Sequence, residues 1–394
     1  MAAAEGESKR SGAGSVAGPL AALMQAAIAL PILAVPAKAG AAEVSEVGFT
    51  LLGYKEKGLM KVTEPIVWAK GTVAQVWDVQ ASGLLDIVSG ASPEGISNLG
   101  GKPVQTITGA SVADHRKQAD VKVTRHLGDL AVGVSGAWST EEDYFSRAFG
   151  VNATYDLDQK NTTLAAGVAR SGDIVGSSDD PSLHEARVTR EYLVGITQVL
   201  SRAAVVQSTL TRSRGRGWYN DPYRYTLTAY PGQGLAPVFF RDKRPPYRDG
   251  WSWLTRYRRH FAEAEGSLQA EYRFYRDDWG IRSHTFEVGW QQSLGERFAV
   301  RPGLRYYTQS AARFYAPLVP VALPEELSSD QRMAAFGGIS PSLKLIARFD
   351  NGFTVEGTAG YSREAASLRF GGSGSELFVP LRAVYGLVTV IKTF

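Results

Sequence analysis

The chain has 394 residues, a formal net charge of +4 and no cysteine. The absence of cysteine excludes disulfides, thiolate metal sites, iron–sulfur clusters and cysteine nucleophiles. So small a charge over this length gives no indication of nucleic-acid binding, and no nucleic-acid partner is expected. The 42 glycines and the 10% of aromatic residues instead favour an all-β chain with many strands.

Residues 1–42 have the layout of a secretory signal peptide. A basic group at residues 8–10 precedes an apolar segment at residues 19–36, and a small-residue cleavage site ends at Ala39. A membrane anchor is the alternative, but the prolines in the apolar segment would break a spanning helix. We therefore expect the mature protein, residues 43–394, to be one barrel domain.

From Glu43 onward, apolar and polar residues alternate with the period of two that is typical of β-strands. The alternating segments are longer than the usual soluble strand of about five or six residues. About sixteen such segments are expected, an even number that places both barrel termini at the same rim. The expected strands are 46–57, 61–71, 75–89, 118–127, 130–142, 144–156, 160–171, 184–200, 202–214, 250–263, 266–277, 280–293, 297–311, 335–350, 352–364 and 379–394.

Two further features favour a transmembrane barrel over a soluble sandwich. Aromatic residues concentrate near the ends of the apolar faces, as interfacial girdles require: Trp77, Phe145, Tyr155, Trp251 and Phe261. Short connections also alternate with long ones, which predicts short periplasmic turns and long extracellular loops. The terminal residue Phe394 would then end the closing strand and serve as the signal for the barrel-assembly machinery, although Lys392 stands where an apolar residue is usual.

The polar strand faces carry many charges, which we expect to point into the lumen because charges facing lipid are costly. A water-filled lumen with an excess of arginine would favour anions, whereas charges that pair across strands would only line or plug it. The candidates for lumen selectivity are Arg256, Arg258, Arg273, Arg301, Arg305, Glu271, Glu287, Arg187 and Glu191.

The longest expected loop, residues 215–249, combines basic and aromatic side chains. Such a combination can bind phosphate, lipopolysaccharide or single-stranded nucleic acid. The alternative is a loop that packs on itself and pairs its arginines with Asp221, Asp242 and Asp249. The binding candidates in and beside this loop are Arg214, Arg216, Trp218, Arg241, Arg244 and Arg248.

No arrangement of residues predicts catalysis, a cofactor or a metal. Ser283 and His284 are adjacent and would face opposite sides of a strand, which argues against a nucleophile–base pair. The acidic pair Asp277 and Asp278 precedes a glycine and is expected to form a turn. An outer-membrane hydrolase remains only a remote alternative.

The segment YRFYRDDWGIRSHTFEVGWQQSLGERFAVRPGLRYYTQSAARFY, residues 272–315, resembles a family of Gram-negative outer-membrane barrels defined only as a domain of unknown function. DIVSGASPEG, YNDPYRY and MKVTEP fit the same family. The resemblance implies an outer-membrane barrel without an assigned substrate or catalytic residue. It also implies a link to periplasmic flavin-transferase and thioredoxin-like proteins, and so to envelope redox traffic.

Two functions are therefore expected to compete. The first is a porin-like passage for small solutes across the outer-membrane lipid, with anions as one candidate class. The second is an occluded, scaffolding barrel that serves a periplasmic or surface protein partner. Inward aromatic residues such as Tyr275 and Tyr307, if they block the lumen, would favour the second.

Overall fold

The computed structural model describes residues 46–90, 93–99, 102–107, 112–228, 238–319 and 323–394. The expected signal peptide lies outside the described residues. Within them, no helix combines the length and the apolar character needed to cross a membrane.

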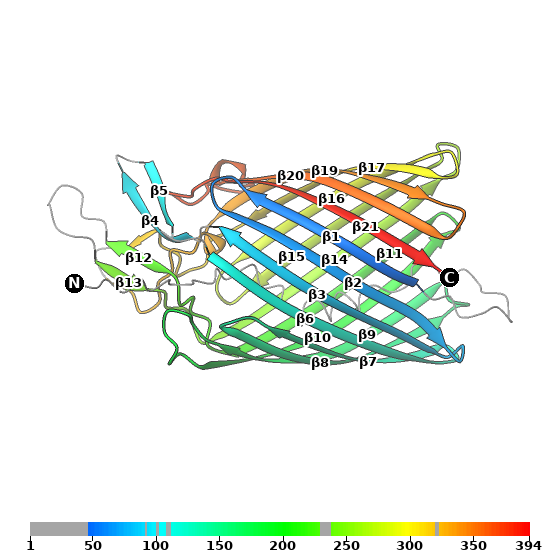
Figure 1. The fold of residues 1–394 in the computed structure, drawn as a ribbon, viewed down its shortest axis with the longest axis horizontal. Coiled ribbons are helices and arrows are strands. Elements are labelled where there is room, and N and C mark those ends of the chain that lie inside the picture. Colours follow the sequence, from blue (N-terminus) through cyan, green and yellow to red (C-terminus); the bar gives the residue numbers. More distant parts are fainter. Residues whose placement is uncertain (1–45, 91–92, 100–101, 108–111, 229–237, 320–322) are drawn as a thin grey trace, which may run out of the picture.

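Sixteen antiparallel strands close into one barrel, as the sequence predicts (Figure 1). Each strand pairs with its neighbours along the chain, and the first strand pairs with the last from Glu46↔Thr393 to Glu56↔Ala383. The barrel strands are β1 (Glu46–Glu56), β2 (Met60–Val73), β3 (Trp77–Gly90), β6 (Val112–Leu127), β7 (Leu130–Thr140), β8 (Tyr144–Leu157), β9 (Thr162–Val175), β10 (Glu185–Ser201), β11 (Ala204–Gly217), β14 (Tyr247–Phe261), β15 (Gly266–Asp277), β16 (Arg282–Leu294), β17 (Phe298–Gln309), β19 (Phe336–Arg348), β20 (Phe353–Ala365) and β21 (Leu381–Thr393).

Large apolar side chains cover the outside of this barrel. Strand alternation places them on one face, where they are exposed although the inner face is polar. Such a face is stable only in contact with lipid, because soluble proteins rarely expose apolar patches of this extent. The barrel therefore spans the outer membrane. Exposed members of this belt include Phe49, Val67, Val121, Phe149, Val168, Val194, Trp253, Phe286, Leu345 and Val388.

The two rims of the barrel differ, as expected from the connection lengths. One rim carries the short turns and the C-terminus, whereas the long connections gather at the other rim (Figure 1). The turn between β6 and β7 contains only two residues, and its Gly128 has a φ of +67°, which favours glycine. We call the two ends the turn rim and the loop rim.

The loop rim is more ordered than the sequence predicts. Residues expected as irregular loops form the hairpin β4 (Pro93–Leu99) with β5 (Lys102–Ile107). A second small sheet joins β12 (Tyr225–Thr228), β13 (Phe239–Arg241) and β18 (Leu318–Val319). Short 3₁₀ turns, η1 (Gln331–Met333) and η2 (Ala366–Leu368), follow in the last two loops.

Several barrel strands also extend farther toward this rim than predicted. β6 begins at Val112, β9 reaches Val175, β11 reaches Gly217 and β14 begins at Tyr247. The apolar–polar alternation that marks the spanning part stops before these ends, because strand ends beyond the membrane no longer need an apolar face. The hydrogen-bonded ladder continues without it, for example at Arg216↔Tyr247.

Candidate functional site

The charged inner wall is concentrated on strands β14 to β17. Alternation from the exposed Trp253 and Leu304 places Arg256, Arg273 and Arg305 on the opposite, inner face. The strand register then aligns Arg256 with Glu271, Glu271 with Glu287, and Glu287 with Arg305. Four charges thus follow one another across four neighbouring strands.

Part of this wall is neutralised by direct pairing. The Arg256 Nε atom lies 2.8 Å from Glu271 Oε2, and Arg273 Nη2 lies 3.6 Å from Glu271 Oε1. Arg301 instead donates from Nη1 to Gln269 Oε1 at 2.9 Å. Its side chain reaches across β16 over Gly289, where an added Cβ would be in ordinary van der Waals contact, 3.7 Å from the Arg301 Cδ and Cγ atoms.

The pairing leaves an excess of positive charge, which we call the lumen arginine patch: Arg256, Arg258, Arg273, Arg301 and Arg305. Among the described residues, Arg258 and Arg305 form no ion pair, and both are exposed to the lumen. Arg258 shares a small hollow of about 100 Å³ with Arg256, Arg301 and both glutamates. The structure therefore brings together seven of the nine predicted lumen residues, namely the five arginines of the patch, Glu271 and Glu287.

The remaining two lumen candidates lie elsewhere and have structural partners. Arg187, near the loop end of β10, is paired with Asp173 at 2.9 Å and donates to the Tyr144 hydroxyl at 3.1 Å. Glu191 is hydrogen-bonded to Ser213 on the neighbouring strand. Both point inward as predicted, but they belong to the wall near the loop rim and not to the lumen arginine patch.

Aromatic side chains pack together where the loops meet the barrel mouth. Trp279, Ile281, Phe314 and Met333 form one buried cluster, which Tyr219 and Tyr275 border. Phe336 and Phe378 stack at 5.0 Å in a second cluster beside Tyr307. The inward residues Tyr275 and Tyr307 are thus packed into the mouth. We call the described residues of the loops that follow β11 and β17 the cap on this side of the mouth.

A buried ion cluster ties two of the loops of this cap together. It consists of three aspartates and three arginines, Asp221, Arg224, Asp242, Arg244, Asp330 and Arg332, and we call it the loop ion cluster. Arg244 pairs with Asp242 at 2.6 Å and with Asp330 at 3.0 Å. Arg332 pairs with Asp330 at 2.6 Å and with Asp221 at 3.0 Å. The ion pairs thereby join the described residues of the loop after β11 to those of the loop before β19.

The loop ion cluster also sets the ionisation of its aspartates. Burial alone would raise the pKa of Asp330, but Arg224, Arg332 and Arg244 together hold this pKa well below its usual range. Asp242 differs, because burial raises its pKa more than Arg244 and its hydrogen bonds lower it. Asp330 is therefore the anion on which the arginines depend most.

The six predicted loop-binding candidates divide into three groups. Arg244 lies in the loop ion cluster, and Arg248 points inward, where it pairs with Asp277 at 2.6 Å and lies over Trp279. The partner of Arg244 within the loop, Asp242, is one that the self-paired alternative named, whereas the partner of Arg248 lies outside the loop, on β15. Trp218 follows β11, and Arg241 ends β13 with an exposed side chain.

Arg214 and Arg216 are not loop residues, contrary to the expectation that placed Arg216 in the loop. Both belong to β11 and alternate with inward residues, so they project to the outside of the barrel. The sequence signal was available in RSRGR, where arginines at every second position indicate one face of a strand. Two outward arginines on other strands, Arg170 and Arg190, were missed because each is the single arginine on the outward face of its strand.

No catalytic arrangement emerges among the described residues. Ser283 and His284 occupy opposite faces of β16, as predicted, and His284 Nδ1 lies 2.9 Å from the outward Tyr272 hydroxyl. The turn expected at Asp277 is present: Asp277 Oδ1 accepts from the Ile281 N–H at 2.9 Å. The described part of the chain contains no group of three or more metal-ligating side chains.

The family model described as "Protein of unknown function (DUF3570)" matches residues 20–183 and 177–382. The chain belongs to this family, which agrees with the resemblance that its motifs indicated. A search of curated protein sequences finds no match.

Several solved structures are similar to this chain, and two of those that follow are named as outer-membrane proteins. CdiB from Acinetobacter baumannii has a TM-score of 0.52 at 8% identity, over 88% of this chain and 60% of its own, so this chain spans less than two thirds of CdiB. A bacterial polysaccharide outer membrane secretin has a TM-score of 0.49 at 6% identity, over 89% of this chain and 98% of its own. OmpT of Vibrio cholerae has a TM-score of 0.45 at 10% identity, over 89% and 97%. At these identities the likeness concerns the fold alone.

Proposed function

We propose that this outer-membrane barrel is a narrow passage for small anionic solutes. The observation that supports the proposal is the lumen arginine patch, in which five inward arginines lie on the same strands as two inward glutamates, Glu271 and Glu287. Rings or clusters of one charge sign on a pore wall select counter-ions. Arg258 and Arg305, which are exposed and form no ion pair with a described residue, would make the first contacts with a passing anion.

The cap at the mouth would set the size limit of such a passage. Aromatic packing and the loop ion cluster hold the long loops in place, so large solutes would be excluded. A small anion would pass beside the packed side and lose part of its hydration shell to guanidinium groups. Arginine suits this role because its planar donors match carboxylate and phosphate groups.

An occluded barrel that serves a partner is the second candidate. It is favoured by the same packed mouth, since Tyr275 and Tyr307 are the inward aromatic residues expected to close the lumen. In that case a surface protein would meet the loop-rim sheets, or a periplasmic protein would meet the short turns and link the barrel to envelope redox traffic. A hydrolase is not proposed, because Ser283 and His284 face opposite sides.

Conductance of the purified protein in a planar bilayer, measured across a salt gradient, separates the two candidates. A passage should give small, stable current steps and a reversal potential that shows anion preference. Removal of residues 221–242 should enlarge the steps, because the cap loses its largest loop. If neither the wild type nor the variant that lacks residues 221–242 conducts, although both are verified to be folded and inserted, the passage is excluded and the partner-binding barrel is favoured.

A further inference from the structure

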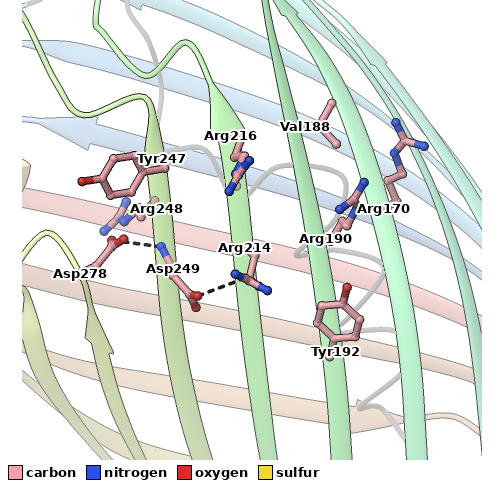
Figure 2. A pocket seen from close by; sticks show the side chains of 11 residues that line it. Arg170, Val188, Arg190, Tyr192, Arg214, Arg216, Tyr247, Arg248, Asp249 and Asp278 are labelled. Carbon is pink, nitrogen blue, oxygen red and sulfur yellow. Dashed lines mark hydrogen bonds and ion pairs between the residues drawn. The ribbon is translucent and has the colours of Figure 1, made fainter.

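Four arginines form a patch on the outer face of the barrel near the loop rim: Arg170, Arg190, Arg214 and Arg216. The strand register aligns Arg170 with Arg190 and Arg190 with Arg214. Their side chains project from three neighbouring strands around a hollow of about 540 Å³ (Figure 2). We call this group the outer arginine patch.

The patch begins where the apolar belt ends. On β10, the outward residues change from Val194 through Tyr192 to Arg190, and on β11 they change from Leu210 to Arg214. Tyr192 and Val194 are exposed at 45% and 57%, as lipid-facing residues are. Two residues along a strand span about 7 Å, so the guanidinium groups lie just beyond the aromatic boundary, at the depth of lipid headgroups.

Most of the positive charge of the patch is not neutralised by the protein. Asp249 accepts from Arg212 at 2.7 Å and lies 3.1 Å from Arg214. Asp278 is engaged with the Asp249 backbone N–H at 3.0 Å. Arg170, Arg190 and Arg216 are exposed and form no ion pair with a described residue. Like charges aligned across strands destabilise a sheet, so this arrangement favours binding of an external anion.

We infer that the outer arginine patch binds the phosphate groups of an outer-leaflet glycolipid, as in the phosphorylated headgroup of lipopolysaccharide. Arginine forms short, charge-assisted hydrogen bonds with phosphate, and basic residues near an anionic membrane surface strengthen binding to it. A lipid is favoured over free phosphate because the patch adjoins the apolar belt, where Val168 and Val194 would contact the acyl chains. This inference does not depend on the proposed transport function.

The test is binding of bisphosphorylated lipid A to the folded barrel in detergent, measured by native mass spectrometry. The double variant Arg170→Ala/Arg190→Ala should weaken this binding by roughly tenfold or more. The matched control is Arg125→Ala/Arg259→Ala, which removes two outward, exposed arginines near the turn rim. The control should retain binding. Heat-modified gel mobility checks that each variant is folded.

Two comparisons decide the chemistry of the ligand. Dephosphorylated lipid should bind weakly and be insensitive to the double variant, and millimolar inorganic phosphate should compete poorly with lipid A. An equal loss of lipid A binding in the control variant would show that any reduction of positive charge weakens binding, and it would overturn the inference. Equal binding of the dephosphorylated lipid would overturn it as well, and full competition by inorganic phosphate would assign the patch to the free ion.

Discussion

Glu271 is the residue that most limits the positive field of the lumen, because it pairs with both Arg256 and Arg273. Arg258 and Arg305 have no such partner among the described residues, so their charges act most directly on ions in the lumen. Arg301 is held by Gln269, a neutral side chain that cannot form an ion pair with it. Selectivity should therefore depend unequally on the five arginines.

We expect the double variant Arg258→Gln/Arg301→Gln to reduce anion preference substantially, because it removes two positive charges that form no direct ion pair with a described residue. The measurement is the reversal potential across a salt gradient. Arg125→Gln, which faces outward near the turn rim, should leave the reversal potential unchanged. An unchanged potential in the double variant would mean that ions do not pass this wall.

A conservative change at Glu271 should act in the opposite direction. Glu271→Gln removes the partner of Arg256 and Arg273 without changing the size of the side chain. We expect a stronger anion preference and a higher conductance in anion-rich solution, measured in the same bilayer experiment. A shift toward cations would contradict the assignment of this wall.

Asp330 is the residue on which the stability of the cap depends most. Its side chain is buried and contacts Arg244 and Arg332. We expect Asp330→Asn to destabilise the cap by about 3–5 kcal/mol, the usual cost of leaving buried charges unpaired. Limited proteolysis should then cut the loops around residues 221–242 faster. Asp350→Asn, which breaks an exposed pair with Arg297, should have little effect.

At the scale of elements, the strands could be predicted and the cap could not. The period of two is visible wherever one strand face contacts lipid and the other does not, and all sixteen barrel strands were found from it. The small sheet of β12, β13 and β18 joins segments distant in the chain. Its strands are two to four residues long, too short for any period to appear.

The position of the lumen arginines could be predicted from the sequence, whereas the pairing of the loop arginines could not. The inward direction of Arg256 or Arg305 follows from strand alternation alone. The partners of Arg244 and Arg332 depend on how two loops fold over the mouth, which no local pattern encodes. Arg214 and Arg216 were found as basic residues, but their outward position depends on where β11 ends.

Acid should loosen the cap before it affects the barrel. The lowered pKa of Asp330 means that its folded state holds the proton less tightly than the unfolded chain, where an aspartate has a pKa of about 3.9. Its contribution to stability is thus complete above about pH 4 and is lost as the pH falls through the lowered value. Proteolysis with an acid-active protease should show loop cleavage rising only below about pH 4, and cleavage that begins near neutrality would contradict this role.

At the scale of the whole molecule, closure depends on the pairing of β1 with β21. Thr389 lies opposite Thr50 on one side and Glu356 on the other. We expect Thr389→Pro to disrupt closure, because proline cannot donate a backbone hydrogen bond to the ladder at the closing strand. The wild-type barrel should be β-rich by circular dichroism and shift its gel mobility on heating, and the variant should lose that shift. Thr389→Val should retain it.

Phe394 follows β21 directly and is exposed at 72%. We propose, as the sequence indicates, that it is the residue read by the barrel-assembly machinery. Phe394→Ala should reduce the amount of folded barrel in the outer membrane without changing the properties of barrels that do insert. Equal amounts of wild type and variant would contradict this.

The loop ion cluster also bears on the order of folding. Asp221 and Arg332 meet although 111 positions separate them in the chain, and β14 to β17 lie between them. Contacts of such long range carry a large loop-closure entropy until the intervening segments are in place. The cap is therefore a late product of folding, formed only after the wall beneath it has been built, and a nascent barrel passes through a stage in which its mouth is still open.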